Sequence, residues 1–199
     1  MQILSNLFPG THYAEAIRQL EELYKEADEK ISEWKKISSL GCAPGCGLCC
    51  SKFEPEVLTV ETDYVALYIC YKKPELLESL ASYREEKHCL FYDHDNSEHC
   101  RIYPARSLLC RLFAFSALSD KDNNPAFHLC TYIEPELMKR IYKGKEIEEY
   151  FQTPLPLMQD YSIRLNSINA GADNTPLPFR RSIFQAINKV QLLAGLTAF

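Results

Sequence analysis

Four cysteines lie close together early in the chain, in the pattern Cys42-x3-Cys46-x2-Cys49-Cys50. Thiolates at such short spacings can converge on one metal ion or on one iron–sulfur cluster. A free cysteine in a helix is usually a small buried hydrophobe, which is a poor explanation for a group in a glycine-rich loop. We therefore interpret the segment as a metal-binding loop.

Further cysteines follow outside the interiors of the predicted helices. Together they give eight candidate metal ligands: Cys42, Cys46, Cys49, Cys50, Cys89, Cys100, Cys110 and Cys130. One zinc ion takes four ligands, so the surplus favours two four-cysteine sites or one iron–sulfur cluster with spare thiols. Neighbouring side chains point in different directions, so we expect that a single ion would not use both Cys49 and Cys50. On these grounds we prefer an iron–sulfur cluster as cofactor, with zinc as the alternative.

Other side chains could contribute to such a centre. Clustered thiolates concentrate negative charge, and Arg106 and Arg111 lie near a cysteine in the sequence, where they could offset that charge or donate hydrogen bonds to sulfur. We therefore predict that both arginines bind the cofactor; solvated surface cations are the alternative. The remaining cysteine, Cys70, falls inside a predicted helix and is interpreted as a core thiol.

Imidazole is also a common zinc ligand, and three histidines crowd one predicted hairpin: His88, His94 and His99. Because thiolates are already in surplus, we interpret these histidines as turn residues or as residues that support the ligands. His128 is an alternative ligand beside the last cysteine. A cysteine nucleophile paired with a histidine is a further alternative, for which the sequence has no local signature.

The elements that must position these residues are mostly helical. Apolar residues at steps of three and four predict a long amphipathic helix that Thr11 caps and Gly41 ends. A second helix is predicted from a cap at Thr59, and a third ends near His88. The segments CLFY and CRIY flank turn-forming residues, which predicts a short β-hairpin whose two arms each begin with a cysteine.

A helix is then predicted from Pro104 through Phe113, followed by a loop over 120–125. Three more helices are predicted around 137–142, 158–168 and 179–193, and strand-like pattern is limited to the hairpin. The basic residues of the last helix, such as Arg180, are interpreted as a solvated face. We expect a mainly α fold whose cysteine-rich loop and hairpin form a metal-binding pole.

The expected organisation is a single domain over 1–199, with a cysteine-cluster core at 42–130 and helical extensions at 1–41 and 131–199. The chain has 199 residues, 46% hydrophobic and 25% charged, which is typical of a globular domain. A net charge of −5 argues against binding to nucleic acid, and no apolar stretch is long enough for a membrane span. The start of the chain lacks a secretory signal, so we expect a cytoplasmic protein, with an unknown protein or small molecule as partner. A reducing compartment and an odd number of cysteines disfavour disulfides.

The order and spacing of these residues resemble a cysteine-cluster family described as a zinc- or iron-chelating domain. The resemblance covers roughly 42–115. The matching residues are Cys42-x3-Cys46-Gly47-x-Cys49-Cys50, Thr59, Glu61, Cys89-Leu-Phe, Cys100-x-Ile-Tyr103-x-x-Arg106 and Cys110-Arg111-x-Phe113. Ser107 and Ala114 stand where the family usually has proline. That family is in turn similar to the flagellin lysine N-methylase, whose cysteine-cluster region is thought to hold iron and sulfur.

The resemblance implies metal binding and leaves other functions open. A cluster-dependent enzyme, either methylase-like or electron-transferring, is one alternative, and a zinc-stabilised interaction module is another. The spacing of the first three cysteines is also that of radical S-adenosylmethionine enzymes. Those enzymes resemble partial parallel barrels with many βα units, whereas this sequence predicts helices and one hairpin, so radical chemistry is not favoured.

Overall fold

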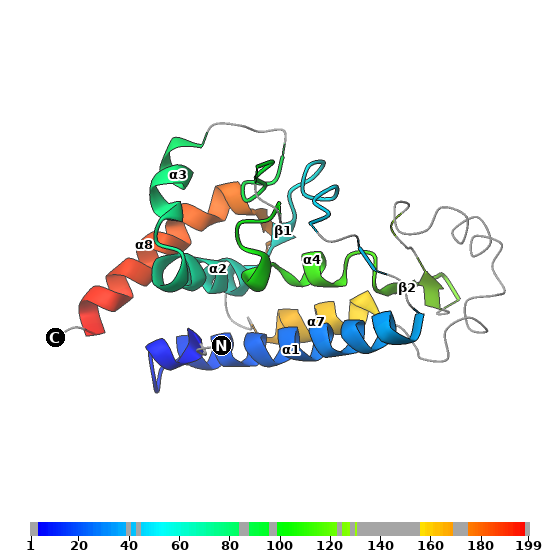
Figure 1. Ribbon diagram of the computed structural model, residues 1–199. Coiled ribbons are helices and arrows are strands. Elements are labelled where there is room, and N and C mark those ends of the chain that lie inside the picture. The colour runs from blue at the N-terminus through cyan, green and yellow to red at the C-terminus, as the bar shows by residue number, and fades with distance from the viewer. Residues whose placement is uncertain are drawn as a thin grey trace. The chain divides into compact units, whose positions relative to one another are not determined.

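The computed structural model describes residues 4–38, 41–42, 45–83, 88–95, 99–122, 125–127, 130, 156–168 and 175–197. These residues are mainly helical, as predicted (Figure 1). The chain divides into two compact units, each built from several segments. Unit 1 comprises Met1–Glu22, Gly45–Ser107 and Asn166–Phe199, and unit 2 comprises Leu23–Pro44 and Leu108–Leu165. The single-domain organisation over 1–199 stays a prediction.

The predicted first helix is α1, which spans His12–Ser38. Its cap is confirmed, because the backbone N–H of Ala14 donates to the Thr11 hydroxyl oxygen at 3.0 Å. A short 3₁₀ helix, η1 at Leu4–Leu7, precedes it. The division between the two units falls within α1, after Glu22.

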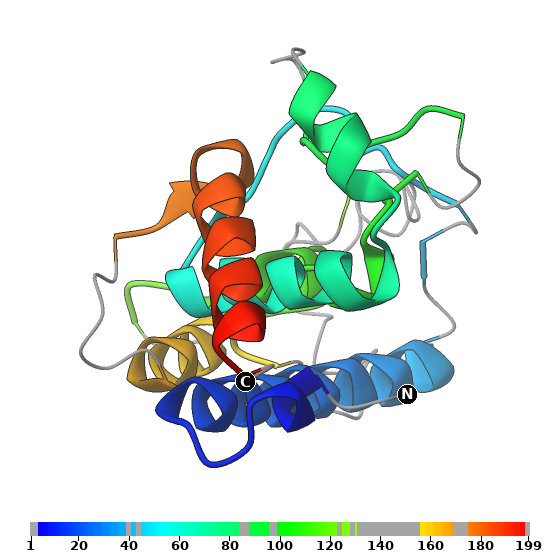
Figure 2. The same cartoon turned by 90° about the vertical axis from the view of Figure 1, so that its left-hand side faces the viewer.

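Unit 1 is built around α2 (Thr59–Lys72) and α8 (Phe179–Thr197), which pack against each other; Figure 2 shows α8 crossing α2. α2 is buried along most of its length, so its sequence lacks the alternation of a surface helix. Strand β1 (Glu56–Val57) leads into α2 and pairs antiparallel with β4 (Leu177–Pro178), which leads into α8. The pairing fixes the starts of the two helices side by side.

Two details of unit 1 differ from the prediction. The cap of α2 is Leu58 rather than Thr59, and the N–H of Leu58 donates to the Glu61 carboxylate at 3.1 Å. Helix α3 covers Leu76–Ser82 and does not continue toward His88, because the backbone at Tyr83 is already extended.

The predicted hairpin is reduced to a single antiparallel bridge between Tyr92 and Cys100. The N–H of Tyr92 donates to the carbonyl of Cys89 at 2.9 Å, which turns the chain where a strand would have to remain extended. The two arms nevertheless lie side by side, because the N–H of Arg101 donates to the carbonyl of Phe91 at 3.0 Å. We call these residues, described at 88–95 and 99–101, the hairpin segment.

The helix predicted from Pro104 through Phe113 is divided in two. A 3₁₀ turn, η2 at Tyr103–Ala105, is followed by extended backbone at Arg106, and α4 then covers Leu108–Leu112. The extended residue interrupts the helical hydrogen bonds, so the two parts cannot form one helix. α4 is the first helix of unit 2 that follows the hairpin segment in the chain.

Unit 2 also contains strands that the sequence pattern missed. Strands β2 (Ala117–Ser119) and β3 (Pro125–Phe127) pair antiparallel around the predicted loop. Helix α7 covers Met158–Ile168, as predicted, and its first residues belong to unit 2. The helix predicted at 137–142 lies outside the described residues. The prediction that strands are limited to one hairpin was wrong. Strands of two or three residues carry too little alternation of polar and apolar residues to be recognised in the sequence.

Among the described residues, no helix has the length and apolar character needed to cross a membrane.

Candidate metal centre

The second half of the cysteine loop contains a hydrogen-bonded turn at 48–52, and we call residues 46–53 the cysteine turn. The N–H of Ser51 donates to the carbonyl of Gly47 at 3.0 Å, and the N–H of Phe53 donates to the carbonyl of Cys49 at 3.2 Å. These are the i to i−4 bonds of an α-helix. The sequence predicted a loop here, and the structure has no helix over 46–53; the two hydrogen bonds give this loop α-type turns.

The turn determines where two of the thiols lie. The sulfur atoms of Cys49 and Cys50 are 3.9 Å apart. Successive residues of a helix are about 100° apart around its axis, so neighbouring side chains can reach the same side, whereas in a strand they point to opposite faces. The expectation that these two side chains diverge was therefore wrong. Two sulfur ligands at about 2.3 Å from one tetrahedral ion are about 3.8 Å apart, so the pair has the spacing of two ligands of one ion.

The ionisation of this pair depends on its surroundings. The Cys49 thiol forms a hydrogen bond with Cys50 and is partly buried. The hydrogen bond and the burial both raise the pKa of the Cys49 thiol above the ordinary value. The metal-free pair therefore keeps a proton at neutral pH. A bound cation would reverse this preference, because a metal-coordinated thiol is deprotonated. In chemistry and in spacing, the two donors fit a thiolate-binding metal.

The hairpin segment lies directly against the cysteine turn. The N–H of Cys89 donates to the carbonyl of Cys50 at 3.0 Å, and Nδ1 of His88 lies 2.7 Å from the carbonyl oxygen of Ser51. Gly47 is buried, and a Cβ added there would come within 2.4 Å of the Cβ of His99. Only glycine allows this approach without a displacement of the neighbouring chain.

The eight predicted cysteine ligands are divided between the units. Unit 1 contains Cys46, Cys49, Cys50, Cys89 and Cys100, and unit 2 contains Cys42, Cys110 and Cys130. Cys89 is buried, Cys42 is exposed, and the other six are intermediate. Among the described residues, no three His, Cys, Asp or Glu side chains are arranged as a group that could hold a metal ion. The full ligand set stays a prediction, and the sulfur pair of Cys49 and Cys50 is the part whose spacing the structure defines.

The two predicted cofactor-binding arginines have contacts of their own. In unit 1, the guanidinium of Arg106 donates to the carbonyl of Tyr103 at 3.1 Å and lies 4.3 Å from the centroid of that ring. In unit 2, the buried Arg111 forms an ion pair with Asp28, and its guanidinium lies 4.1 Å from the centroid of Tyr24. These contacts give both arginines a structural role, and their binding of a cofactor stays a prediction.

Unit 1 also contains a partly buried ion pair that the sequence did not predict. The carboxylate of Glu54, just after the cysteine turn, pairs with the guanidinium of Arg180 at the start of α8. It also accepts the N–H of Arg180 at 3.1 Å and the N–H of Leu90 at 3.3 Å. The Arg180 guanidinium donates to the carbonyl of His88 at 2.6 Å. Arg180 is therefore not on a solvated face, and no local pattern could have indicated a partner so distant in the sequence.

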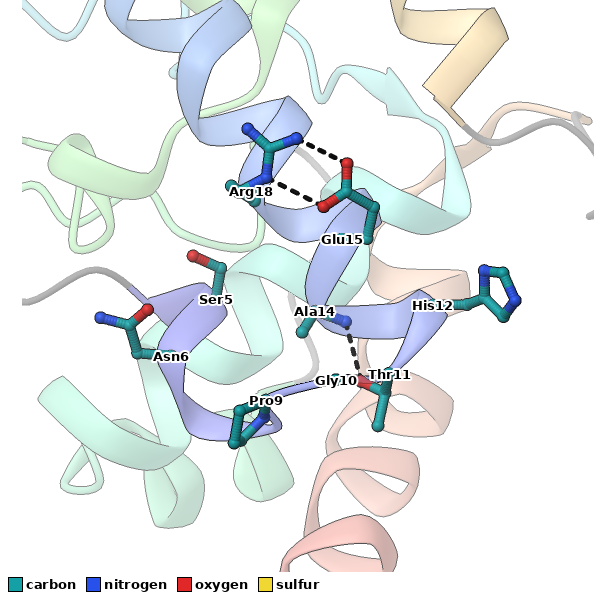
Figure 3. A pocket seen from close by; sticks show the side chains of 9 residues that line it. All are labelled: Ser5, Asn6, Pro9, Gly10, Thr11, His12, Ala14, Glu15 and Arg18. Atoms are coloured by element: carbon teal, nitrogen blue, oxygen red, sulfur yellow. Dashed lines mark hydrogen bonds and ion pairs between the residues drawn. The ribbon is translucent and has the colours of Figure 1, made fainter.

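A cavity of about 630 Å³ lies at the start of α1 (Figure 3). Its lining residues are Ser5, Asn6, Pro9, Gly10, Thr11, His12, Ala14, Glu15 and Arg18. Hydrogen bonds from Arg18 and Gln19 lower the pKa of the Glu15 carboxyl to about 2, so it is ionised at neutral pH. Because none of the predicted ligands lines it, we do not assign the metal centre to this cavity.

Comparison with known proteins agrees with the donor chemistry of the cysteine turn. Residues 41–131 match the family model CxxCxxCC, described as "Putative zinc- or iron-chelating domain". The match begins just before the first cysteine of the loop and ends just after the last cysteine. No curated protein and no solved structure matches the chain, and the similarity to the flagellin lysine N-methylase stays a prediction. The matched segment, 91 of the 199 residues, is similar to the zinc- or iron-chelating domains of this family.

Proposed function

We propose that the protein binds an iron–sulfur cluster through clustered thiolates, with Cys49 and Cys50 as two ligands of the same iron. The observation that carries this proposal is the separation of 3.9 Å between the two sulfur atoms. The family match of 41–131 supports binding of zinc or iron, and the sulfur spacing supports a shared metal ion.

The spacing also bears on the type of cluster. Each iron of a [2Fe–2S] cluster takes two protein ligands, whereas each iron of a [4Fe–4S] cluster takes one. A vicinal pair at 3.9 Å is therefore better suited to one iron of a [2Fe–2S] cluster. Such a cluster would supply one-electron transfer. A zinc ion held by the same pair is the alternative form of the centre.

The surrounding protein would support such a centre in two ways. A backbone hydrogen bond from Cys89 to the carbonyl of Cys50 holds the hairpin segment against the cysteine turn, which supports Cys89 as a further candidate ligand. The ion pair between Glu54 and Arg180 fixes the end of the turn to the start of α8. Side chains around the ligands could then move on metal binding while the backbone stays in place.

Anaerobic purification after expression with abundant iron tests the proposal. Brown protein with equal amounts of iron and acid-labile sulfide is the expected result. Colourless protein with stoichiometric zinc would reject the cluster and leave the zinc form. Folded protein that binds neither iron nor zinc would contradict metal binding altogether.

A further inference from the structure

One side chain of unit 1 joins three segments that lie far apart in the sequence. The guanidinium of Arg180, in the first turn of α8, pairs through Nε with the carboxylate of Glu54, the residue after the cysteine turn. Its Nη2 donates to the carbonyl of His88 in the hairpin segment at 2.6 Å. Because a guanidinium is planar and its N–H groups have fixed directions, these contacts define where the two segments lie relative to α8.

The carboxylate of Glu54 extends this connection. Oε1 accepts the N–H of Leu90 in the hairpin segment at 3.3 Å and the N–H of Arg180 at 3.1 Å, whereas Oε2 pairs with the guanidinium. The side chain of Glu54 is 8% exposed and that of Arg180 is 25% exposed, so solvent has limited access to these bonds. Shielded, charge-assisted hydrogen bonds are stronger than those of an exposed pair. We call this set of contacts the Arg180 junction.

The two segments that meet at the Arg180 junction carry candidate ligands of the metal centre. The cysteine turn contains the sulfur pair of Cys49 and Cys50, and the hairpin segment contains Cys89 and Cys100. The N–H of Cys89 donates to the carbonyl of Cys50 at 3.0 Å, so the segments are also in direct contact. Since one zinc ion or one cluster takes four ligands, the sulfur pair needs further donors. A donor from the hairpin segment can join the pair only while the two segments remain together.

A second ion pair of α8 has similar chemistry and different partners. Nζ of Lys189 lies 2.5 Å from the carboxylate of Asp63 on α2, whose side chain is 6% exposed. The same nitrogen lies 4.6 Å from the centroid of Tyr13 on α1. None of the eight predicted ligands lies on α1 or α2. This ion pair therefore stabilises the packing of α8 against other helices, whereas the Arg180 junction joins α8 to the segments of the metal centre.

We propose that Arg180 is a positioning residue of the metal centre, which makes the segment 177–197 a part of that centre although it lies outside the matched residues 41–131. This inference rests on the proposed function. Arg180 binds no metal itself, because a guanidinium stays protonated and has no acceptor atom. It keeps the cysteine turn and the hairpin segment together, so that less conformational freedom is lost when their donors close around a metal.

The first test measures the Co²⁺ affinity of the full chain by competition with a chelator. Arg180→Ala is expected to lower the affinity by about tenfold or more, as is typical when a side chain that supports metal ligands is removed. Lys189→Ala is the matched control from the same helix. It should lower the melting temperature of the metal-free protein, because Asp63 loses its partner, and leave the Co²⁺ affinity unchanged. Circular dichroism establishes that each variant is folded at the temperature of the titration.

Arg180→Lys separates position from charge. A lysine ammonium can pair with Glu54, but it is a single point charge without the second, separately directed donor that reaches the carbonyl of His88. The Co²⁺ affinity of this variant should therefore remain below that of the wild type. Wild-type affinity in Arg180→Lys would overturn the proposal, because charge alone would then be sufficient. Equal losses of affinity in Arg180→Ala and Lys189→Ala would also overturn it, because the loss would then reflect general stability.

Hydrogen exchange of the wild-type protein is the second test and does not depend on a variant that folds. Coupling between two sites is reciprocal, so loading with iron and sulfide, or with zinc, should slow amide exchange at the start of α8 more than around Lys189. Metal binding with unchanged exchange at the start of α8 would overturn the inference and leave the proposed function intact. Wild-type protein that binds none of these metals would overturn both.

Discussion

The cysteine turn of unit 1 and helix α4 of unit 2 carry similar sequence signals and have different surroundings. Both place a cysteine beside a basic residue: Cys50 precedes the exposed Lys52 by two positions, and Cys110 directly precedes Arg111. In the turn, Cys50 contacts a second thiol and the hairpin segment. In α4, the basic residue is buried against Asp28 and Tyr24. The comparison teaches that a cysteine motif indicates donors, whereas tertiary contacts decide which donors meet.

The largest expected effect comes from the sulfur pair itself. Cys49→Ser or Cys50→Ser should reduce metal content from one centre per chain to near zero, because each removes one of two thiolates on the same ion. Cys70→Ser on α2 is the control and should leave metal content unchanged. Iron, zinc and sulfide analysis measures the result; equal retention of metal in all three variants would refute a role for the pair.

The next largest expected effect is a loss of stability when one of two ion pairs is removed. Glu54→Ala removes the carboxylate that pairs with the partly buried guanidinium of Arg180 and accepts two backbone N–H groups, so the free energy of unfolding should fall by about 2–3 kcal/mol. In unit 2, Glu26→Ala removes a more exposed pair with Arg164 and should cost less than about 1 kcal/mol.

Denaturant titration of both variants, with the Arg180→Ala variant and the double variant, measures the difference. If Glu54→Ala costs no more than Glu26→Ala, the ion pair does not fix the cysteine turn to α8.

A smaller effect is expected at Gly47. A methyl group there would meet the Cβ of His99 at 2.4 Å, so Gly47→Ala should destabilise the fold by about 1–3 kcal/mol and weaken metal binding. At Gly195 on α8, an added Cβ meets no atom within 4 Å, so Gly195→Ala should stabilise by about 0.5–1 kcal/mol. Thermal unfolding distinguishes the two; a stabilised Gly47→Ala would contradict the close contact.

The smallest effect concerns Ala114 in unit 2, where φ is 68°. Glycine accepts this conformation without strain, so Ala114→Gly should raise the free energy of unfolding by about 0.5–1 kcal/mol. Proline has φ near −65°, so Ala114→Pro should destabilise. Chemical denaturation of both variants is the measurement, and a stabilising Ala114→Pro would show that the backbone differs there.

Much of the fold could be predicted because its signals are local. The cap at Thr11, the whole of α7 and the start of α8 at Phe179 follow from hydrophobic period and end signals within a few residues. The short strands could not be predicted, since β1 and β4 each contain two residues and depend on one another. The full hairpin predicted from the sequence is absent for a related reason: a turn that begins at Cys89 stands where the first strand was expected.

The sequence by itself determined the donor chemistry, because residue type and spacing within one loop are sufficient to indicate thiolate binding of a metal. It also determined the mainly helical class through periodicity. Only the tertiary structure decided that the sulfur atoms of Cys49 and Cys50 lie 3.9 Å apart, that Nδ1 of His88 lies 2.7 Å from the carbonyl oxygen of Ser51, and that Glu54 pairs with Arg180. The contacts of His88 and Arg180 join residues distant along the chain, about which local pattern carries no information. The sulfur spacing depends on a turn conformation that the residue pattern does not specify.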